Sequence, residues 1–281
     1  MTTSNYVNLI DSQFISISGD DRKDFLQGLI TNDINKCNSN TPIYSCFLSP
    51  QGKFIADFFV TDREKNYLIE IHKKFISDFL DKLRIYKLRS KITINDNEDF
   101  KSLVILENNN LLQSNNDIIN FIDPRNNKLG RKVYIKLDRI NDFKNKFNLQ
   151  EIKFKSYREL LIKNLIPFSP DDLIINKSLI LENNFEKINA IDWDKGCYVG
   201  QEITARMKYR ALLKKSIRAV EIISGNVNPG NKILNNKNAI GEIISCFNNL
   251  AIAMLKIDDA NDAIKNNKIL KTEFASLKII H

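Results

Sequence analysis

The chain has 281 residues, of which 43% are hydrophobic and 27% are charged, and its formal net charge is +8. This length suits a globular protein of two or three packed modules, and no apolar run reaches the roughly eighteen residues of a transmembrane helix. A basic chain favours a polyanionic partner such as RNA, but Lys far outnumbers Arg, the better residue for bidentate phosphate recognition. We therefore expect a solvated basic surface, with neither a membrane nor a nucleic acid as a direct partner.

The N-terminus and the cysteines bear on the compartment and on metal binding. Residues 1–10 contain no Arg, no basic segment and no apolar core, which predicts a cytoplasmic protein without a targeting peptide. None of the four cysteines belongs to a C-x-x-C pair; they are Cys37, Cys46, Cys197 and Cys246. With only two histidines in the chain, we expect reduced thiols and no dedicated metal site.

The first half of the chain alternates between strand and helix patterns. A hairpin is predicted from two β-rich runs, 43–48 and 54–60, because Ser49-Pro50-Gln51-Gly52 between them has the Pro and Gly positions of a type I turn. Apolar alternation and helical spacing predict the other elements. These are strands at 6–10, 14–17 and 67–71 and helices near 25–30 and 75–86.

The second half changes character after Arg210. Before it, short strands are predicted near 92–94, 103–106 and 133–135, and a helix near 156–164 that ends before Pro167. After it, short apolar runs are separated by Gly, Asn and Pro, which is typical of a small barrel or sandwich. The runs are 217–223, 240–246, 250–255 and 277–280. We therefore predict two domains, 1–212 and 213–281.

Four segments carry a family resemblance. The most specific is Asp194-Lys195-Gly196-Cys197-Tyr198-Val199-Gly200-Gln201-Glu202, continuing through Thr204-Ala205-Arg206. The others are Phe25-Leu26-Gln27-Gly28 with Thr31-Asn32-Asp33, Leu48-Ser49-Pro50-Gln51-Gly52-Lys53 with Ala56-Asp57-Phe58, and Asp123-Pro124-Arg125 with Leu129-Gly130-Arg131. In this order they resemble the YgfZ-like folate-binding family of iron–sulfur cluster assembly proteins, over most of the chain.

The resemblance implies a fold and a function. The fold would be α+β, with aminomethyltransferase-like (GcvT-like) modules around a central opening and a C-terminal β-barrel. The protein would bind tetrahydrofolate and support iron–sulfur cluster assembly or repair in client enzymes, some of them tRNA-modifying. Its partners would be those clients or other assembly factors, and it would act as an accessory factor more than as a turnover enzyme.

Cys197 is the candidate reactive residue. Lys195 lies two residues before it and Arg206 lies in the segment that follows, and a positive neighbourhood favours the reactive thiolate. Free cysteines are more often small buried hydrophobic residues. The resemblance favours function, with the thiol as a ligand, a nucleophile or a redox group.

The folate site would use charged and aromatic groups around this cysteine. On a helix, Glu202 and Arg206 share one face, where they form either a surface salt bridge or a site for the pterin edge and the anionic glutamyl tail. Glu182 is the alternative carboxylate. Tyr198 is a candidate for stacking on the ring, whereas Trp193 is better explained by packing. Lys195, Gln201 and Asp57 complete the candidate folate site.

Several alternatives stay open. Aminomethyltransferases carry an acidic pair where this chain has Ala56-Asp57. Because Ala56 replaces one carboxylate of that pair, aminomethyl transfer of the glycine-cleavage type is only the second functional hypothesis. Asp123 and Arg125 suit an ion-paired turn around Pro124 better than a ligand site. Gly196 and Gly200 are either turn glycines or places where a ligand approaches the backbone. RNA binding and a scaffold built on all four cysteines are the remaining hypotheses.

Overall fold

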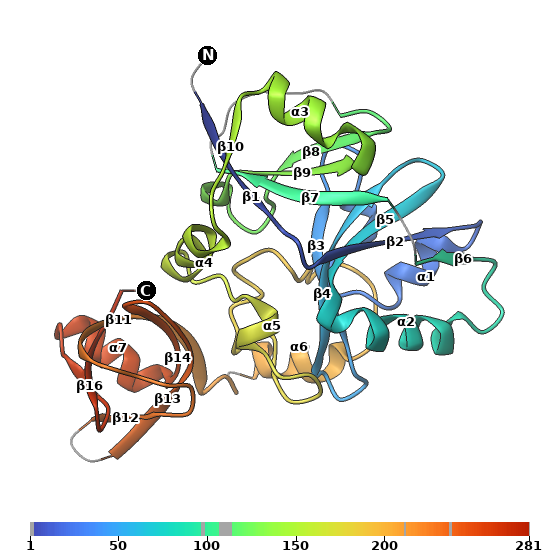
Figure 1. The fold of residues 1–281 in the computed structure, drawn as a ribbon. Helices are drawn as coiled ribbons and strands as arrows, with labels where there is room; N and C mark the ends of the chain where they lie inside the picture. The colour runs from blue at the N-terminus through green and yellow to red at the C-terminus, as the bar shows by residue number, and fades with distance from the viewer. Residues whose placement is uncertain (1–2, 97–98, 107–113, 211, 236–237, 281) are drawn as a thin grey trace. The chain divides into compact units, whose positions relative to one another are not determined.

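The computed structural model describes residues 3–96, 99–106, 114–210, 212–235 and 238–280 (Figure 1). Its contacts divide the chain into two units, each built from two separate stretches of sequence. The first unit comprises Met1–Tyr157 and Lys187–Gln201, and the second comprises Arg158–Glu186 and Glu202–His281. No helix among the described residues is both long and apolar enough to cross a membrane.

The first sheet of the first unit has the order β3-β4-β5-β2-β6, with every pair antiparallel. Its strands are β2 (Ser12–Ser18), β3 (Ile43–Leu48), β4 (Phe54–Asp62), β5 (Asn66–His72) and β6 (Thr93–Asn95). Helix α2 (Lys73–Lys87) packs on one face, where the Phe79 ring lies 4.8 Å from that of Phe58 and 5.8 Å from that of Phe47. Because side chains alternate along a strand, Phe59 projects from the opposite face.

The second sheet of this unit has the order β10-β1-β7-β9-β8, in which only β1 and β10 among the pairs described are parallel. Its strands are β1 (Ser4–Asn8), β7 (Phe100–Ile105), β8 (Ile118–Ile122), β9 (Arg131–Lys136) and β10 (Leu149–Glu151). Helix α3 (Ile140–Lys146) covers one face through Phe143, which packs in a cluster with Tyr6, Leu103 and Val133.

Aromatic rings fill the layer between the two sheets. The Phe59 ring of the first sheet lies 6.3 Å from that of Phe121 in the second, and the Phe14 ring lies 4.9 Å from that of Tyr134. The first unit is therefore a four-layer arrangement, in which two facing sheets are each covered by a helix on the outside.

A buried ion pair joins the two sheets inside this layer. Lys132 on β9 places its ammonium nitrogen 2.8 Å from Oε2 of Glu70 on β5, and both side chains are almost fully buried. Tyr134 donates to Oε2 at 2.9 Å, and Ser12 donates to Oε1 at 2.7 Å. Burial, the largest single influence, would raise the pKa of Glu70, but the charge of Lys132 and the hydrogen bonds that the carboxylate accepts together outweigh it and lower the pKa.

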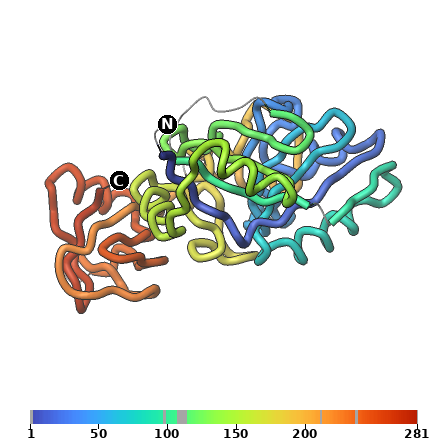
Figure 2. Tube along the Cα trace, turned by 45° about the horizontal axis from the view of Figure 1, so that its top comes forward, coloured from blue at the N-terminus to red at the C-terminus, as the bar shows by residue number. Residues whose placement is uncertain are grey.

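The second unit contains a closed barrel with the strand order β11-β14-β13-β12-β15-β16, drawn in orange and red in Figure 2. Its strands are β11 (Lys215–Gly225), β12 (Lys232–Asn235), β13 (Asn238–Phe247), β14 (Leu250–Lys256), β15 (Leu270–Lys271) and β16 (Ala275–Ile279). Helix α7 (Ile257–Lys265) packs on the barrel core through Ala260 and Ala263. Closure leaves the barrel without an open sheet edge.

Residues 158–186 belong to this second unit because buried polar contacts bind them to the barrel. Arg158 on α4 (Phe154–Lys163) donates to Asp172 at 2.6 Å and to Ser245 on β13 at 3.0 Å. Asp172 lies at the end of α5 (Ser169–Asp172) and also accepts a hydrogen bond from Ser245. The domain boundary predicted near residue 212 stays a prediction.

The predicted α+β fold with a C-terminal β-barrel is confirmed. The hairpin is also confirmed, because the Gly52 amide donates to the Ser49 carbonyl at 2.8 Å across the turn. Strands β8 and β10 and helices α3 and α7 were not predicted. The apolar residues of β8 and α3 are interrupted by Asn, and β10 is only three residues long, so these elements have no clear period. Helix α7 does carry Ile257, Ala260 and Ile264 at helical spacing, a signal that was overlooked in the sequence.

Candidate functional site

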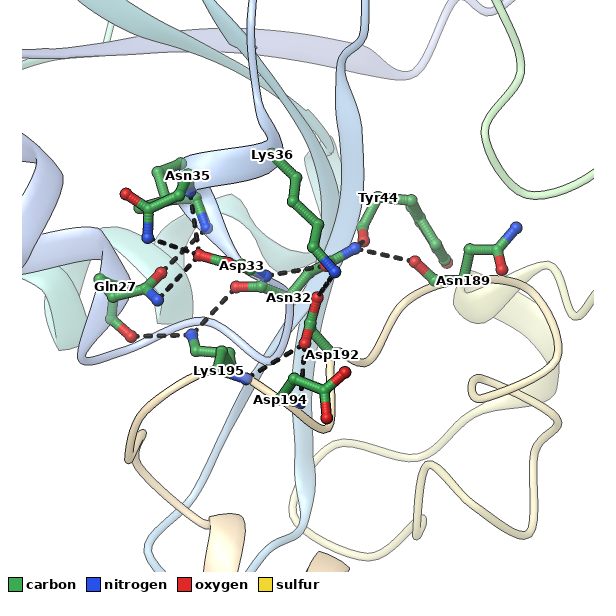
Figure 3. Close-up of polar contacts among 11 residues, drawn as sticks. Gln27, Asn32, Asp33, Asn35, Lys36, Tyr44, Asn189, Asp192, Asp194 and Lys195 are labelled. Atoms are coloured by element: carbon green, nitrogen blue, oxygen red, sulfur yellow. Dashed lines mark hydrogen bonds and ion pairs between the residues drawn. The ribbon is translucent and has the colours of Figure 1, made fainter.

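The candidate site is built around residues 192–200, here called the signature loop, which belong to the first unit. Asp192 fixes the start of the loop. Its amide donates to the Thr31 carbonyl at 3.0 Å, and its carboxylate accepts the amides of Asp194 at 2.9 Å and Lys195 at 3.1 Å (Figure 3). Lys36 adds an ion pair to the same carboxylate. Burial alone would raise the pKa of Asp192, but the hydrogen bond from Lys36 and those from the amides lower it.

Lys195 holds the middle of the loop. Its ammonium group donates to three main-chain carbonyls, those of Gln27 at 2.8 Å, Ile30 at 2.6 Å and Asn32 at 2.9 Å. An ammonium group has three N–H donors, and all three are used here. The residue is 7% exposed, and burial lowers its pKa to about 8. Lys195 therefore anchors the loop to the segment after α1 (Arg22–Gln27) and directs its charge into the protein.

Residues 25–28 and 31–33, which carry part of the family resemblance, contact the signature loop. The Gln27 side chain donates a hydrogen bond to Asp33 at 2.9 Å. It also accepts a hydrogen bond from the amide of Ile34, the first residue of the short 3-10 helix Ile34–Lys36. The Asn32 side chain donates to the carbonyls of Tyr44 and Asn189, each at 2.8 Å. Two segments more than 150 residues apart in sequence thus form one polar cluster (Figure 3).

The end of the loop is fixed by close packing. Tyr198 is 6% exposed, and its hydroxyl has no hydrogen-bond partner among the described residues. The Val199 amide donates to the Gly28 carbonyl at 3.1 Å. Gly200 has φ +82°, and a Cβ there would lie 2.5 Å from the Ser49 carbonyl oxygen in the hairpin turn. The fold thus explains why Gly200 is a glycine, and burial of the Tyr198 ring favours a packing role for it.

Gly196 and Cys197 differ from their neighbours because both are exposed. A Cβ at position 196 would meet no atom within 4 Å, so the fold itself places no steric demand there. The loop is held on both sides of this pair by Lys195 and by Tyr198. It therefore presents the Cys197 thiol to solvent from a fixed backbone.

The other three thiols are sheltered. Cys37 donates to the Val60 carbonyl at 3.2 Å, and burial raises its pKa to about 12. Cys46 is completely buried, and burial raises its pKa well above the usual value. Cys246 is half-buried and donates to the Val227 carbonyl at 3.4 Å. All four cysteines lie in the described part of the chain, and Cys197 alone among them is classed as exposed.

Helix α6 (Gln201–Tyr209) follows the signature loop, and from Glu202 onward it belongs to the second unit. Glu202 and Arg206 are both exposed, and within the described residues no ion pair joins them. Gln201 is half-buried, and its amide donates to the Tyr198 carbonyl at 3.1 Å. Glu182 is half-buried, and its main-chain carbonyl accepts the amide of Ile217 on β11.

Asp57 lies in a second polar group of the first unit, which sequence reasoning only partly identified. It is half-buried on β4 and accepts a hydrogen bond of 2.5 Å from the Tyr44 hydroxyl. Burial, followed by the Asp57 charge, raises the pKa of Tyr44 well above its usual value. Ala56 is completely buried. Tyr44 was missed because an aromatic residue in a strand pattern usually signals core packing.

The ion-paired turn expected at Pro124 is confirmed. Arg125 donates to the two Asp123 carboxylate oxygens at 3.0 and 2.7 Å, and to the Tyr157 hydroxyl at 2.7 Å. Its guanidinium lies 5.3 Å from the Tyr44 ring centroid and 4.9 Å from that of Phe59. These contacts are internal to the first unit and give Arg125 a structural role. Among the described residues, no three Cys, His, Asp or Glu side chains come together as metal ligands.

Comparison with known proteins gives relatives for most of the chain, although no family model matches it. The chain is 28% identical over 245 residues to the mitochondrial iron–sulfur cluster assembly factor IBA57 homolog of Coccidioides immitis, covering 78% of this chain and 57% of that protein. The homolog of Mycosarcoma maydis is 28% identical over 218 residues, covering 72% and 53%. That of Dictyostelium discoideum is 26% identical over 248 residues, covering 75% and 61%. The chain thus spans little more than half the length of these curated relatives.

A solved structure shares the fold. The glycine cleavage system aminomethyltransferase T of Bartonella henselae superimposes with a TM-score of 0.79, covering 99% of this chain and 85% of that one, at 11% sequence identity. At this identity the likeness shows the fold alone, and it confirms the aminomethyltransferase-like architecture.

The expected cytoplasmic location is wrong, since the relatives named above are mitochondrial proteins. The expectation rested on the composition of residues 1–10 alone. Ten residues are a short stretch from which to infer a compartment, whereas the similarity to the mitochondrial relatives covers about three quarters of the chain.

Proposed function

We propose that this chain is an accessory factor of iron–sulfur cluster assembly, acting on client enzymes or with other assembly factors. The similarity to IBA57 homologs over about three quarters of the chain supports this role. The single observation that carries the proposal is the exposed Cys197 on a loop whose neighbouring residues are held inward. Asp192, Lys195 and Tyr198 of that loop are buried, whereas Cys197 is exposed.

A thiol presented in this way suits transient chemistry with a partner. Thiolate sulfur is a soft ligand for iron and also a nucleophile. The absence of a side chain at Gly196 leaves room beside the thiol for a partner to approach. The carbonyl contacts of Lys195 keep the backbone in place, so that a partner would meet a preformed site.

Cys197→Ser is expected to fold normally and to lose support for iron–sulfur enzyme maturation. A hydroxyl nearly fills the volume of a thiol, but it stays protonated near neutral pH and is no soft ligand. Because the residue is exposed, the melting temperature should be unchanged. The measurement is complementation of a strain lacking its mitochondrial assembly factor of this kind, beside a melting curve. Cys246→Ser is the matched control and should complement fully. Full complementation by a stably folded Cys197→Ser protein would remove the thiol from the site.

We further propose that the chain binds tetrahydrofolate, as the resemblance to the YgfZ-like folate-binding family implies. The aminomethyltransferase-like fold supports this proposal. The charged candidates are Glu202 and Arg206, both exposed on α6, and the half-buried Asp57 of the first unit is an alternative carboxylate. A carboxylate can accept two hydrogen bonds from the donor edge of a pterin, and a guanidinium can bind the anionic glutamyl tail. Gln201 is available for a further polar contact. Lys195 and Tyr198 would contribute by fixing the loop, because their polar groups face inward.

Glu202→Ala is expected to weaken tetrahydrofolate binding by about 1.5–3 kcal/mol, the usual contribution of hydrogen bonds to a charged group. Titration calorimetry measures this change directly. Glu273→Ala, which removes an exposed carboxylate from the barrel unit, is the control and should leave the affinity unchanged. An unaltered affinity in folded Glu202→Ala would transfer the role to Glu182 or Asp57.

Aminomethyl transfer is the second candidate function. The fold and the Tyr44–Asp57 hydrogen bond favour it, whereas the buried Ala56 replaces one member of the acidic pair. Binding a folate requires fewer groups than catalysing transfer on it. An assay with a methylamine-loaded lipoyl carrier protein separates the two, since an accessory factor releases no ammonia and forms no methylenetetrahydrofolate. Iron–sulfur tRNA-modifying enzymes are the first clients to test.

A further inference from the structure

The last turns of α2 and the residues that follow the helix combine positive charge with exposed apolar side chains. Residues 82–91 contain five basic residues and no acidic one. The basic residues are Lys82, Arg84, Lys87, Arg89 and Lys91. This segment was not singled out in the sequence, because its charges alternate with Leu, Ile and Tyr.

The helix geometry places much of this charge in solvent. Phe75, Phe79 and Leu83 form the inner face of α2 and are buried against the first sheet. The outer face of the last turns therefore exposes Lys82, Arg84 and Ile85, and Ile85 is 62% exposed. An isoleucine on the outer face contributes nothing to the core.

Leu88, the residue that ends the helix, is held in an uncommon conformation. Its backbone has φ 42° and ψ −112°, a region that glycine adopts readily and a bulky side chain rarely does. Its side chain is nevertheless 86% exposed, so no core packing compensates for the strain. Strained backbone of this kind is concentrated at binding sites and switches.

The chain on both sides of Leu88 is fixed. The Ser90 amide donates to the Lys87 carbonyl at 2.8 Å, and the Lys91 amide donates to the Asp21 carboxylate at 2.7 Å. Gly19, with φ +107°, packs against this stretch so closely that a Cβ would lie 2.1 Å from the Lys91 carbonyl oxygen. Leu88, Arg89 and Ser90 line a shallow groove together with Asp21.

The basic residues are only partly explained by the helix. Cations near a helix C-terminus are stabilised by its dipole, which accounts for Arg84 and Lys87. Arg84 also forms ion pairs with Asp81 and Asp96. Arg89 and Lys91 lie beyond the helix, and in the described part of the chain neither side chain has an ion-pair partner. The dipole also gives no reason for exposed Ile85 and Leu88.

We propose that this surface, formed by Lys82, Ile85, Leu88, Arg89 and Lys91, docks an acidic peptide segment of a partner protein that also carries apolar side chains. Carboxylates would pair with the basic side chains, and an apolar side chain would cover Leu88 beside the groove. A nucleic acid would leave the two aliphatic side chains uncovered, and a membrane would require a wider apolar face. This interaction goes beyond the thiol chemistry proposed for Cys197 and does not depend on it.

The test uses a fluorescein-labelled synthetic peptide of repeated Glu-Glu-Leu triplets and fluorescence anisotropy with the whole chain. We expect binding that weakens with added salt, and an affinity reduced about ten-fold or more by Arg89→Glu and by Leu88→Gly. Leu88→Gly relieves the strained backbone, so its melting temperature should equal or exceed that of the wild type. Lys271→Glu and Phe274→Ala, both exposed positions on the barrel unit, are the matched controls and should bind like the wild type.

Four outcomes would overturn the proposal. The first is absence of peptide binding at low salt, and the second is equal binding by the wild type and the two variants of the surface. The third is displacement of the peptide by a single-stranded RNA oligonucleotide or by phosphatidylglycerol vesicles as readily as by unlabelled peptide. The same peptide with Gln in place of Glu should bind much more weakly, and equal binding by it would also contradict the role of charge.

Discussion

Lys132→Met is expected to lower the free energy of unfolding by about 3–5 kcal/mol, because it leaves Glu70 charged and unpaired between two sheets. The Lys132 ammonium is the cation of this pair, whereas Tyr134 and Ser12 supply only neutral donors. Chemical denaturation at neutral pH measures the loss. Lys232→Met removes an exposed ion pair with Glu242 on the barrel and should cost less than about 1 kcal/mol.

The pH dependence of this loss identifies its cause. In the wild type the pKa of Glu70 is lowered, so its stabilising contribution is present above the unfolded-state pKa and is lost as the pH falls through the folded value. In Lys132→Met the folded-state pKa of Glu70 should be raised instead, and protonation then removes the penalty. The difference in stability should therefore begin to narrow as the pH falls through the raised pKa of the variant, and it should narrow further below the unfolded-state value of about 4.3. The double variant Glu70→Gln/Lys132→Met should recover part of the stability that Lys132→Met loses. A cost below about 1 kcal/mol for Lys132→Met alone would contradict the structural role of the Lys132–Glu70 ion pair.

Gly200→Ala is expected to destabilise the chain by about 2–4 kcal/mol, as the sum of left-handed backbone strain and overpacking. The added methyl group would lie 2.5 Å from the Ser49 carbonyl oxygen and 2.9 Å from the Leu48 Cβ atom. Either the signature loop or the hairpin turn would have to move. Thermal and denaturant unfolding measure the loss.

Gly196→Ala is the matched control for this prediction, since it adds the same methyl group four residues earlier in the same loop. The new atom would meet nothing within 4 Å, so the stability should change by less than about 0.5 kcal/mol. Equal destabilisation by the two variants would contradict the packing described here. Loss of complementation by Gly196→Ala without loss of stability would show that the space beside Cys197 is used by a partner.

The parts of the fold that sequence predicted are those with strong local signals. The hairpin carried a Pro and a Gly at fixed turn positions, and the barrel strands appeared as short apolar runs separated by turn residues. The grouping of residues 158–186 with the barrel was not predicted, because it depends on Arg158 meeting Asp172 and Ser245. Contacts between residues distant in the chain leave no period in the sequence.

The candidate site also depends on contacts that the sequence could not predict. The sequence identified the signature loop, but it treated Lys195 as a group that acts on Cys197 or on folate. The structure uses that ammonium to hold three main-chain carbonyls, a role that requires knowledge of where Gln27 and Asn32 lie. Gly200 and Gly196 looked equivalent in sequence, and only the backbone angle and the neighbouring turn distinguish them.

The interleaved order of the two units has a consequence for how the protein is made. The first unit needs residues 187–201, but the ribosome delivers residues 158–186, which belong to the second unit, before them. At about 5–20 residues per second, the nascent chain therefore holds the two sheets of the first unit without the segment 187–201 for a few seconds. During that interval the carbonyls of Gln27, Ile30 and Asn32 lack the lysine that joins them, and the second unit still awaits its barrel. Neither unit can be completed strictly before the other begins, so a chaperone would meet this nascent chain with both units open.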